Sequence, residues 1–200
     1  LGTGAVTFVD VDALNLGFGG FTITTVGNAS ASFQAGGAIT ITEDVNLGTG
    51  ELTLNSTGAI TQGSGDTIIA GGLSLLGSGT VTLSESANEV DVLAGNRNGN
   101  VTYRDADGID IGTVAGTAGL SVTGTLNLTA GGSITDSQAL TITGDSTFTV
   151  TNGSSITLNS AANNFGGTLM FNASSGTIAN VTIVDTTAVD LQALTLSANL

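Results

Sequence analysis

Apolar and polar residues alternate along this chain in short runs, which are bounded by glycine, asparagine, aspartate or serine. The apolar residues form pairs two positions apart, such as Val6/Phe8, Leu14/Leu16, Phe21/Ile23, Ile39/Ile41, Leu52/Leu54, Val81/Leu83, Val90/Val92 and Leu126/Leu128. This alternation predicts strands of three to five residues with one buried side. The polar residue within each pair is very often threonine, whose β-branched side chain suits the exposed side of a strand. No 3.6-residue periodicity persists for three turns, so the sequence predicts an all-β fold.

A longer pattern returns after 74 or 75 residues. Residues 52–61 and 126–135 carry leucine, glycine and isoleucine at equivalent positions, beginning with Leu52 and Leu126. Residues 1–8 match residues 76–83 at an offset of 75, which adds a partial copy at the start. Because both ends of the chain fall inside a unit, we expect a segment of a longer array. The predicted organisation is one continuous segment over residues 1–200, with units at about 1–51 (partial), 52–125 and 126–199.

Short strands with glycine-rich ends are compatible with a sandwich, a barrel or a solenoid. The long repeat favours a solenoid, in which each coil stacks on a near-copy of itself. Aromatic residues make up only 4% of the chain, which disfavours the aromatic girdles of a membrane barrel. We therefore predict a single-stranded parallel β-helix with coils of roughly 20 residues, in the right-handed sense that parallel crossovers prefer. In this fold Leu54 and Leu128 point inward, and glycine and asparagine form the corners between strands.

The amino-acid composition excludes several kinds of functional site. The chain has no proline, cysteine, histidine or tryptophan, and its two cations are Arg97 and Arg104. The absence of cysteine and histidine excludes zinc fingers, iron–sulfur sites and haem ligation. Without histidine there is no Ser-His-Asp hydrolase, and without lysine no phosphate-binding P-loop. The net charge of −14 disfavours contact with nucleic acid and anionic membranes, and no apolar run approaches the ~18 residues of a membrane helix.

Two stretches share the sub-motif G-x-L-x-L-x-(A/S/N)-x-G-x-I-x, at residues 50–61 and 124–135. This motif resembles the β-helical repeats of filamentous haemagglutinin-like exoproteins and related repeat-rich surface proteins of Gram-negative bacteria. The resemblance implies coil geometry throughout most of the chain. It also implies export to the cell surface or the medium, and a role as an adhesin, a toxin stalk or a surface fibre.

The densest polar cluster lies at residues 103–110. Its carboxylates Asp105, Asp107 and Asp110 are hard oxygen donors of the kind that bind calcium. Their spacing differs from an EF-hand loop, and the equivalent stretch of the next unit has no carboxylates. The competing interpretation is an acidic, solvated turn in which Arg104 pairs locally, and we predict no metal site on this basis.

Paired carboxylates also raise the question of catalysis, because some parallel β-helices cleave glycans. Asp10 and Asp12 flank one residue of a predicted strand, and a second grouping contains Glu85, Glu89 and Asp91. The chain lacks a basic residue placed to assist them and has a single tyrosine for sugar stacking. We therefore predict no catalytic residues, no cofactor and no enzyme.

Buried asparagines are predicted where Asn88 and Asn163 each follow an alanine, 75 residues apart. Such side chains are expected to bond along a ladder from coil to coil rather than to bind a ligand.

These observations favour a structural element of a bacterial surface or extracellular fibre, which stacks on itself end to end or laterally. The alternative is an adhesin that binds a cell-surface glycan or protein through the least repetitive stretch, residues 95–108. A carbohydrate-active β-helix enzyme is the third hypothesis.

Overall fold

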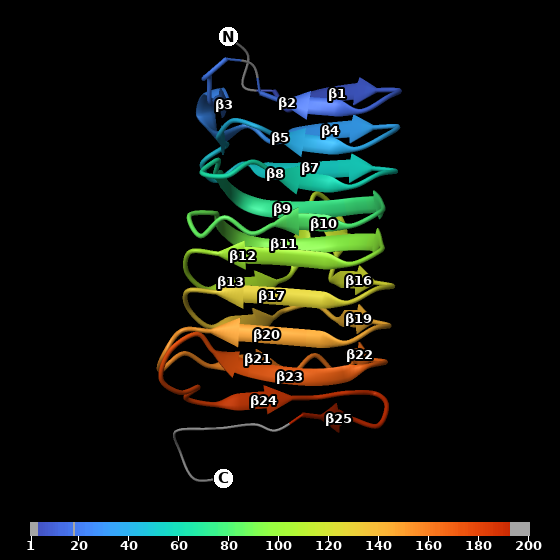
Figure 1. Ribbon diagram of the computed structural model, residues 1–200, viewed down its shortest axis with the longest axis vertical. Coiled ribbons are helices and arrows are strands. Elements are labelled where there is room, and N and C mark those ends of the chain that lie inside the picture. Colours follow the sequence, from blue (N-terminus) through green and yellow to red (C-terminus); the bar gives the residue numbers. More distant parts are fainter. Residues whose placement is uncertain (1–3, 18, 193–200) are drawn as a thin grey trace.

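Short strands wind around a common axis in nine coils, each stacked on the one before (Figure 1). The computed structural model describes residues 4–17 and 19–192. Within them every strand pair is parallel except one hairpin, so the predicted all-β solenoid is confirmed. Leu14 and Leu191 occupy the same position eight coils apart, which gives an average of about 22 residues a coil. The right-handed sense stays a prediction.

The strands form three faces. The first face contains β1 (Val6–Asp10), β4 (Ala31–Ala35), β7 (Glu51–Ser56), the C-terminal parts of β9 (Ile68–Ser78) and β11 (Glu89–Asn98), β16 (Leu120–Val122), β19 (Leu140–Ile142) and β22 (Asn164–Phe165). The second face contains β2 (Leu14–Leu16), β5 (Ile39–Ile41), β8 (Ile60–Gln62), β10 (Val81–Leu83), β12 (Val101–Asp105), β17 (Leu126–Ala130), β20 (Ser146–Val150), β23 (Thr168–Ala173) and β25 (Asp190–Leu191). The third face contains β3 (Ile23–Thr24), β6 (Val45–Asn46), the N-terminal parts of β9 and β11, β13 (Ile109–Ile111), β18 (Ile134–Asp136), β21 (Ile156–Leu158) and β24 (Val181–Ile183).

The core is a set of aliphatic ladders inside the coils. On the second face like residues stack in register, as in Ile39, Ile60, Val81 and Val101, and burial of each such side chain contributes about 1.5–3 kcal/mol. Leu54 and Leu128 are fully buried, so their predicted inward orientation is confirmed. Towards the C-terminal end Phe148, Phe165 and Phe171 fill the interior; the Phe148 ring lies edge-on to Phe165 and stacks on Phe171.

Two of the predicted apolar pairs differ from the structure. Phe21 lies before β3 and is exposed, so the predicted Phe21/Ile23 strand is reduced to Ile23–Thr24. In β11 the pair Val90/Val92 is broken, because Val90 and Leu93 are buried while Val92 is not. This strand runs from the third face onto the first face. The alternation shifts by one residue where it crosses between them, so apolar side chains point inward on both faces.

One corner is glycine in seven consecutive coils. A Cβ on Gly99 would lie 2.5 Å from the carbonyl oxygen of Gly79, and a Cβ on Gly79 would lie 2.6 Å from that of Gly58. The column between the first and second faces is Gly37, Gly58, Gly79, Gly99, Gly124, Gly144 and Gly167. Any side chain at this corner would push neighbouring coils apart, which explains part of the high glycine content.

A hairpin interrupts one coil. The strands β14 (Thr113–Val114) and β15 (Thr117–Ala118) pair antiparallel and fold back onto the outer side of the first face. Val114 is buried there, and its side chain occupies the space beside Gly72. The Ala115 amide donates to Glu51 Oε2 at 3.1 Å. Residues 95–108, the least repetitive stretch of the sequence, mostly belong to β11 and β12, and the excursion from the coil lies just beyond them.

The sequence repeat does not stack on itself. Leu52 lies on the first face and its counterpart Leu126 on the second. Ile60 lies on the second face and Ile134 on the third. A unit of 74 residues spans about three and one-third coils of about 22 residues, so each unit turns the pattern by one face. The expectation that a coil lies on its own near-copy was wrong; the unit boundaries stay predictions.

Candidate functional site

The N-terminal end of the solenoid is an open apolar surface. In the described residues β1 pairs only with β4, on one of its two edges. Val6 and Phe8 are 46% and 47% exposed, whereas Leu52 and Leu54, at the same ladder positions two coils on, are 0% exposed. Within the described residues, the first coil therefore has one unpaired strand edge and partly exposed side chains at core positions.

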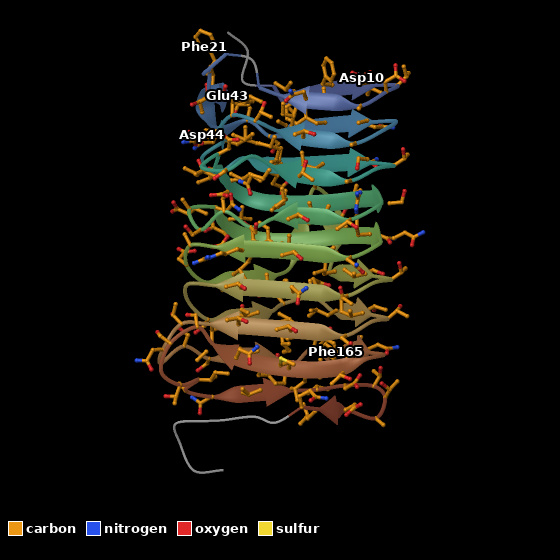
Figure 2. All side chains as sticks on the ribbon, viewed as in Figure 1. Asp10, Phe21, Glu43, Asp44 and Phe165 are labelled. Carbon is orange, nitrogen blue, oxygen red and sulfur yellow. The ribbon has the colours of Figure 1, made fainter. Side chains whose placement is uncertain are left out.

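A cavity of about 450 Å³ opens at this end. Its apolar lining comes from all three faces of the first coils: Phe8, Leu14, Leu16, Phe21, Ile23 and Phe33. Figure 2 shows Phe21 at the rim, beyond the first coil. No lining residue is titratable, so the cavity can bury apolar surface but offers no acid, base or metal ligand.

Carboxylates near this end cap turns. Figure 2 places Asp10, Glu43 and Asp44 around the first coils. Glu43 Oε1 accepts the Gly20 amide at 2.6 Å, and Asp44 Oδ1 accepts the Thr67 amide at 2.7 Å. Asp10 ends β1, and its Oδ1 accepts the Asp12 amide in the following bend at 3.1 Å. The prediction that Asp10 and Asp12 share one side of a strand was wrong, since the strand ends between them.

The acidic segment at residues 103–110 is partly internal. Asp105 is buried, and its Oδ2 accepts hydrogen bonds from the Tyr103 hydroxyl at 2.8 Å and the Val90 amide at 3.0 Å. Burial raises the pKa of Asp105 to about 7, although these bonds favour the ionised form. Burial and the neighbouring Asp105 raise the pKa of Tyr103 well above its usual value. The pair is a buried polar contact of the coil interior.

The three candidate calcium ligands point to different places. Asp107 is exposed, and its amide donates to Asp105 Oδ1 at 3.2 Å. Asp110 accepts hydrogen bonds from the hydroxyls of Thr135 and Ser137 in the next coil. Among the residues that the structure describes, no three His, Cys, Asp or Glu side chains gather in a metal-binding group.

Arg97 is an internal cation that sequence reasoning missed. It is fully buried, and desolvation lowers its pKa to about 10. It is paired with Gly77 in the ladder, and its guanidinium reaches past this glycine to the coil of Ser56 and Gly58. Nε donates at 3.1 Å to the Gly79 carbonyl, and the remaining acceptors are the carbonyls of Ser56, Gly58 and Leu76 and the Ser56 hydroxyl. The guanidinium therefore ties three consecutive coils together.

Arg104 is exposed, on the outer side of β12. Its guanidinium makes no ion pair or hydrogen bond within residues 4–17 and 19–192. The predicted local pairing of Arg104 with the acidic turn was wrong, because Asp105 points inward and Asp110 bonds to the next coil.

The second carboxylate grouping stays on the surface. Glu89 and Asp91 are exposed on β11, and Glu85 lies in the turn before it. No side-chain hydrogen bond joins Glu85, Glu89 and Asp91 to each other in the described part of the chain. The structure thus brings no acid–base pair together from either grouping.

The predicted asparagine ladder is confirmed. Asn88 is fully buried, and its Oδ1 accepts the Ile68 amide of the preceding coil at 2.9 Å, while Nδ2 donates to the Arg104 carbonyl of the following coil at 3.2 Å. Asn163 is also buried and accepts the Leu140 amide at 2.8 Å. Both side chains join coils, and neither is free to bind a ligand.

Comparison with protein families identifies the repeats. A family described as "Repeats of unknown function (DUF5649)" matches residues 36–94 and 98–172, which is more than half of the chain. The chain belongs to this family. The matched DUF5649 residues run from the second coil into β23 and are interrupted only at residues 95–97, in the C-terminal part of β11. Searches of curated proteins and of solved structures found no match.

Within the described residues there is also no helix of the length and apolarity needed to cross a membrane.

Proposed function

We propose that this DUF5649 segment is a non-catalytic structural element of a bacterial surface or extracellular fibre. The observation that carries the proposal is the parallel, in-register stacking of nine coils on one aliphatic core, in which each coil repeats the backbone contacts of the one before. A further coil stacked on β1 would bury Val6 and Phe8 as Leu52 and Leu54 are buried. End-to-end stacking of solenoids extends such a rod without a new kind of contact.

Two further observations support a structural role. The sub-motif at residues 50–61 and 124–135 resembles the repeats of filamentous haemagglutinin-like exoproteins, and this resemblance supports a location outside the cell. The buried charged residues Arg97 and Asp105 bond to neighbouring coils and to an interior tyrosine, respectively. The proposal assigns the chain no enzyme activity, no cofactor and no nucleic-acid partner.

The test is the assembly state of the purified chain, seen by negative-stain electron microscopy at moderate salt, which screens the charge of −14. The expected particles are rods whose lengths are multiples of one segment. Phe8→Asp at the open end should abolish the longer rods. Val11→Asp is the matched control, because Val11 is 83% exposed and lies outside the strand. Single-length particles at every concentration, or depolymerisation of a glycan by the chain, would contradict the proposal.

The second candidate function is an adhesin, and the hairpin of β14 and β15 favours it. Insertions into coils often form the binding face of a solenoid, and this hairpin projects from the coil path onto an outer surface. Replacing residues 113–118 by a two-glycine link should abolish attachment to cells or glycans while the thermal transition persists. Unchanged attachment would remove the hairpin from the candidate surface.

A further inference from the structure

A polar groove of about 210 Å³ runs along the corner where the second face turns into the third. Its lining comes from five consecutive coils, from Ser86 in the fourth coil to Ser174 in the eighth. Between these two residues the lining includes Arg104, Thr129 and Thr151. No aromatic side chain is among the described residues that line it.

The lengths of the corners explain why a groove forms here. The corners of the fifth and sixth coils, residues 106–108 and 131–133, are shorter than the corners on either side, which are residues 84–88, 151–155 and 174–180. The short corners therefore form the floor of the groove, and the longer corners bound its two ends. At about 4.8 Å a coil, the groove is about 19 Å long from the fourth coil to the eighth.

Arg104 is the one exposed cation in the part of the chain that the structure describes, and it lies in this groove. Its guanidinium has no ion pair or hydrogen bond there. It begins an in-register row that continues through Thr129, Thr149 and Asn172, whose side chains are also without a hydrogen-bond partner in the described residues. Asp105 lines the groove too, but its buried carboxylate is bonded inside the coil. The groove thus combines one unpaired cation with a row of unused neutral polar groups.

The charge along this corner changes at Arg104. Towards the N-terminal end the corner carries Glu85 and Asp107. The corners that follow β17, β20 and β23 contain no aspartate or glutamate. Asp145 and Asp190, the acids of the second face in these coils, lie at its opposite edge, beside the glycine column. The groove therefore offers one positive charge at Arg104 and a neutral track beyond it.

We propose that this groove binds an oligosaccharide that carries one carboxylated sugar at an end; this rests on the adhesin role, the second candidate function above. The guanidinium of Arg104 presents forked donors that match a carboxylate. The neutral sugars that follow then meet the side chains of Thr129, Thr149 and Asn172. A glycan with a carboxylate on every sugar would instead be repelled by the net charge of −14.

The geometry favours a glycan over an extended peptide. A peptide usually binds a sheet by adding a strand to a free edge, but the backbones of β12, β17 and β20 are already paired with the coils on both sides. What the groove leaves free is side-chain hydroxyl, amide and guanidinium groups, which suit a ligand rich in hydroxyls. Coils repeat about every 4.8 Å, close to the length of one pyranose ring in an extended chain, so successive sugars meet successive residues of the row.

The affinity of this contact is expected to be low. Without an aromatic ring to stack on the sugars, a few hydrogen bonds and one ion pair give a dissociation constant on the order of 1 mM. A contact this weak cannot hold a cell by itself, so it acts alongside the hairpin of β14 and β15 and gains strength by repetition along a rod.

Nuclear magnetic resonance of the ¹⁵N-labelled chain tests the proposal, with two matched tetrasaccharides as probes. Aldotetraouronic acid, in which one glucuronate is attached to xylotriose, should shift the backbone amide signals of residues 104–106, 129–131, 151 and 174 and saturate at millimolar concentration. Xylotetraose, which lacks the carboxylate, should bind at least about tenfold more weakly. All proteins carry Phe8→Asp, which keeps end-to-end stacking out of the measurement.

Two pairs of variants locate the contact. Arg104→Gln should raise the dissociation constant for aldotetraouronic acid at least about tenfold. Its control is Thr141→Glu, which changes the net charge by the same one unit at an exposed position of the first face and should bind normally. Thr129→Val removes one hydroxyl at constant shape and should weaken binding about threefold, whereas Thr141→Val should not. Thermal melts should show every variant folded.

Three results would overturn the proposal. The first is the absence of saturable shifts up to about 20 mM aldotetraouronic acid. The second is equal binding of xylotetraose, or binding that Arg104→Gln leaves unchanged. The third is equally strong binding of N-acetyl-tetraalanine through Arg104, which would assign the groove to a peptide carboxylate.

These outcomes are separate from the tests of the functions proposed above. The chain that lacks residues 113–118 should still bind aldotetraouronic acid, because the hairpin lies on the first face. Loss of cell attachment on removal of the hairpin, together with no binding in the groove, would leave the adhesin role and overturn the glycan site. Binding in the groove by a chain that attaches to no cell would do the reverse.

Rod formation does not involve Arg104, so electron microscopy of the rods is independent of both.

Discussion

At the scale of single residues, the interior of the solenoid contains one ionisable acid that titrates near neutrality. The pKa of Asp105 is about 7 in the fold and near 3.9 in an unfolded chain. Between these values the folded state binds the proton more tightly, so this group stabilises the fold below about pH 4 and its contribution is lost as the pH rises towards 7.

Asp105→Asn should remove this loss of folding stability with rising pH. Between pH 4.5 and 7.5 the melting temperature of the unmodified chain should fall more than that of the variant, with a difference of about 2–4 kcal/mol in unfolding free energy. Thermal melts followed by circular dichroism measure it. Asp110→Asn, at a partly exposed position, is the control and should keep the pH dependence. Parallel curves for Asp105→Asn and the unmodified chain would show that Asp105 is not the titrating group.

The buried cation gives a second prediction at this scale. Arg97→Met keeps much of the side-chain volume but removes the hydrogen bonds that the guanidinium donates to the carbonyls of Ser56, Leu76, Gly58 and Gly79. The unfolding free energy should drop by about 3–5 kcal/mol. Arg104→Met, at the exposed arginine, should change it by less than about 0.5 kcal/mol. Urea denaturation compares the two variants, and equal effects would contradict the internal role of Arg97.

The alternation along the sequence already assigns both buried charged side chains to the inward side of their strands. Tyr103 and Asp105 follow Val101 at inward spacing, and Arg97 follows Leu93 and Gly95 in the same way. The residue types alone would predict that Arg97 and Asp105 are exposed, because charged side chains are seldom buried. Their burial depends on hydrogen-bond partners in neighbouring coils, namely the carbonyls that accept from Arg97 and the Val90 amide that donates to Asp105. The local sequence does not specify these partners.

At the scale of elements, the hairpin of β14 and β15 has a strained turn. Ala115 adopts a φ of +50°, and Gly116 follows at +81°, a pair of values that favours Asn-Gly. Ala115→Asn should therefore stabilise the chain by about 0.5–1 kcal/mol. The control is Ala118→Asn in the extended strand of the same hairpin, which should not stabilise. Differential scanning calorimetry measures both, and a lower melting temperature for Ala115→Asn would contradict the turn geometry.

The inward and outward sides of one strand give the next prediction. Leu128→Asp should cost about 4 kcal/mol or more, because it buries a charge without a partner. Asn127→Asp, one residue earlier on the outer side of β17, should be nearly neutral. Urea titration of the two variants decides it; a similar loss in both, or none in Leu128→Asp, would show that the side chains are assigned to the wrong sides.

Strand positions were the part of the fold most accessible to sequence reasoning. The i, i+2 pairs and the glycine boundaries locate nearly every strand, because period-two alternation reports one buried side. The hairpin escaped detection because Thr113–Val114 and Thr117–Ala118 are too short to show alternation. The cavity escaped detection because Phe8, Leu14 and Phe33 stand at ordinary inward positions of the alternation, which does not mark the side chains that border a cavity.

At the scale of the whole molecule, the repeat and the coil have different lengths. A 74-residue unit covers about three and one-third coils, so three units return the pattern to its starting face after about ten coils. Leu52 and Leu126 consequently belong to different faces. This relation could not be found from the repeat alone, since it also needs the coil length, which varies from 20 to 25 residues with corner insertions.

In-register, parallel stacking of successive coils is the central feature of the molecule, and distances between spin labels along one ladder test it directly. Each protein carries a label at Asn15 and a second at Thr102, Thr147 or Met170, which lie four, six and seven coils away. Pulsed electron paramagnetic resonance should give separations of about 19, 29 and 34 Å, rising by about 4.8 Å per coil. Distances that fail to increase in this order, or that return to short values as strands fold back on one another, would contradict the solenoid.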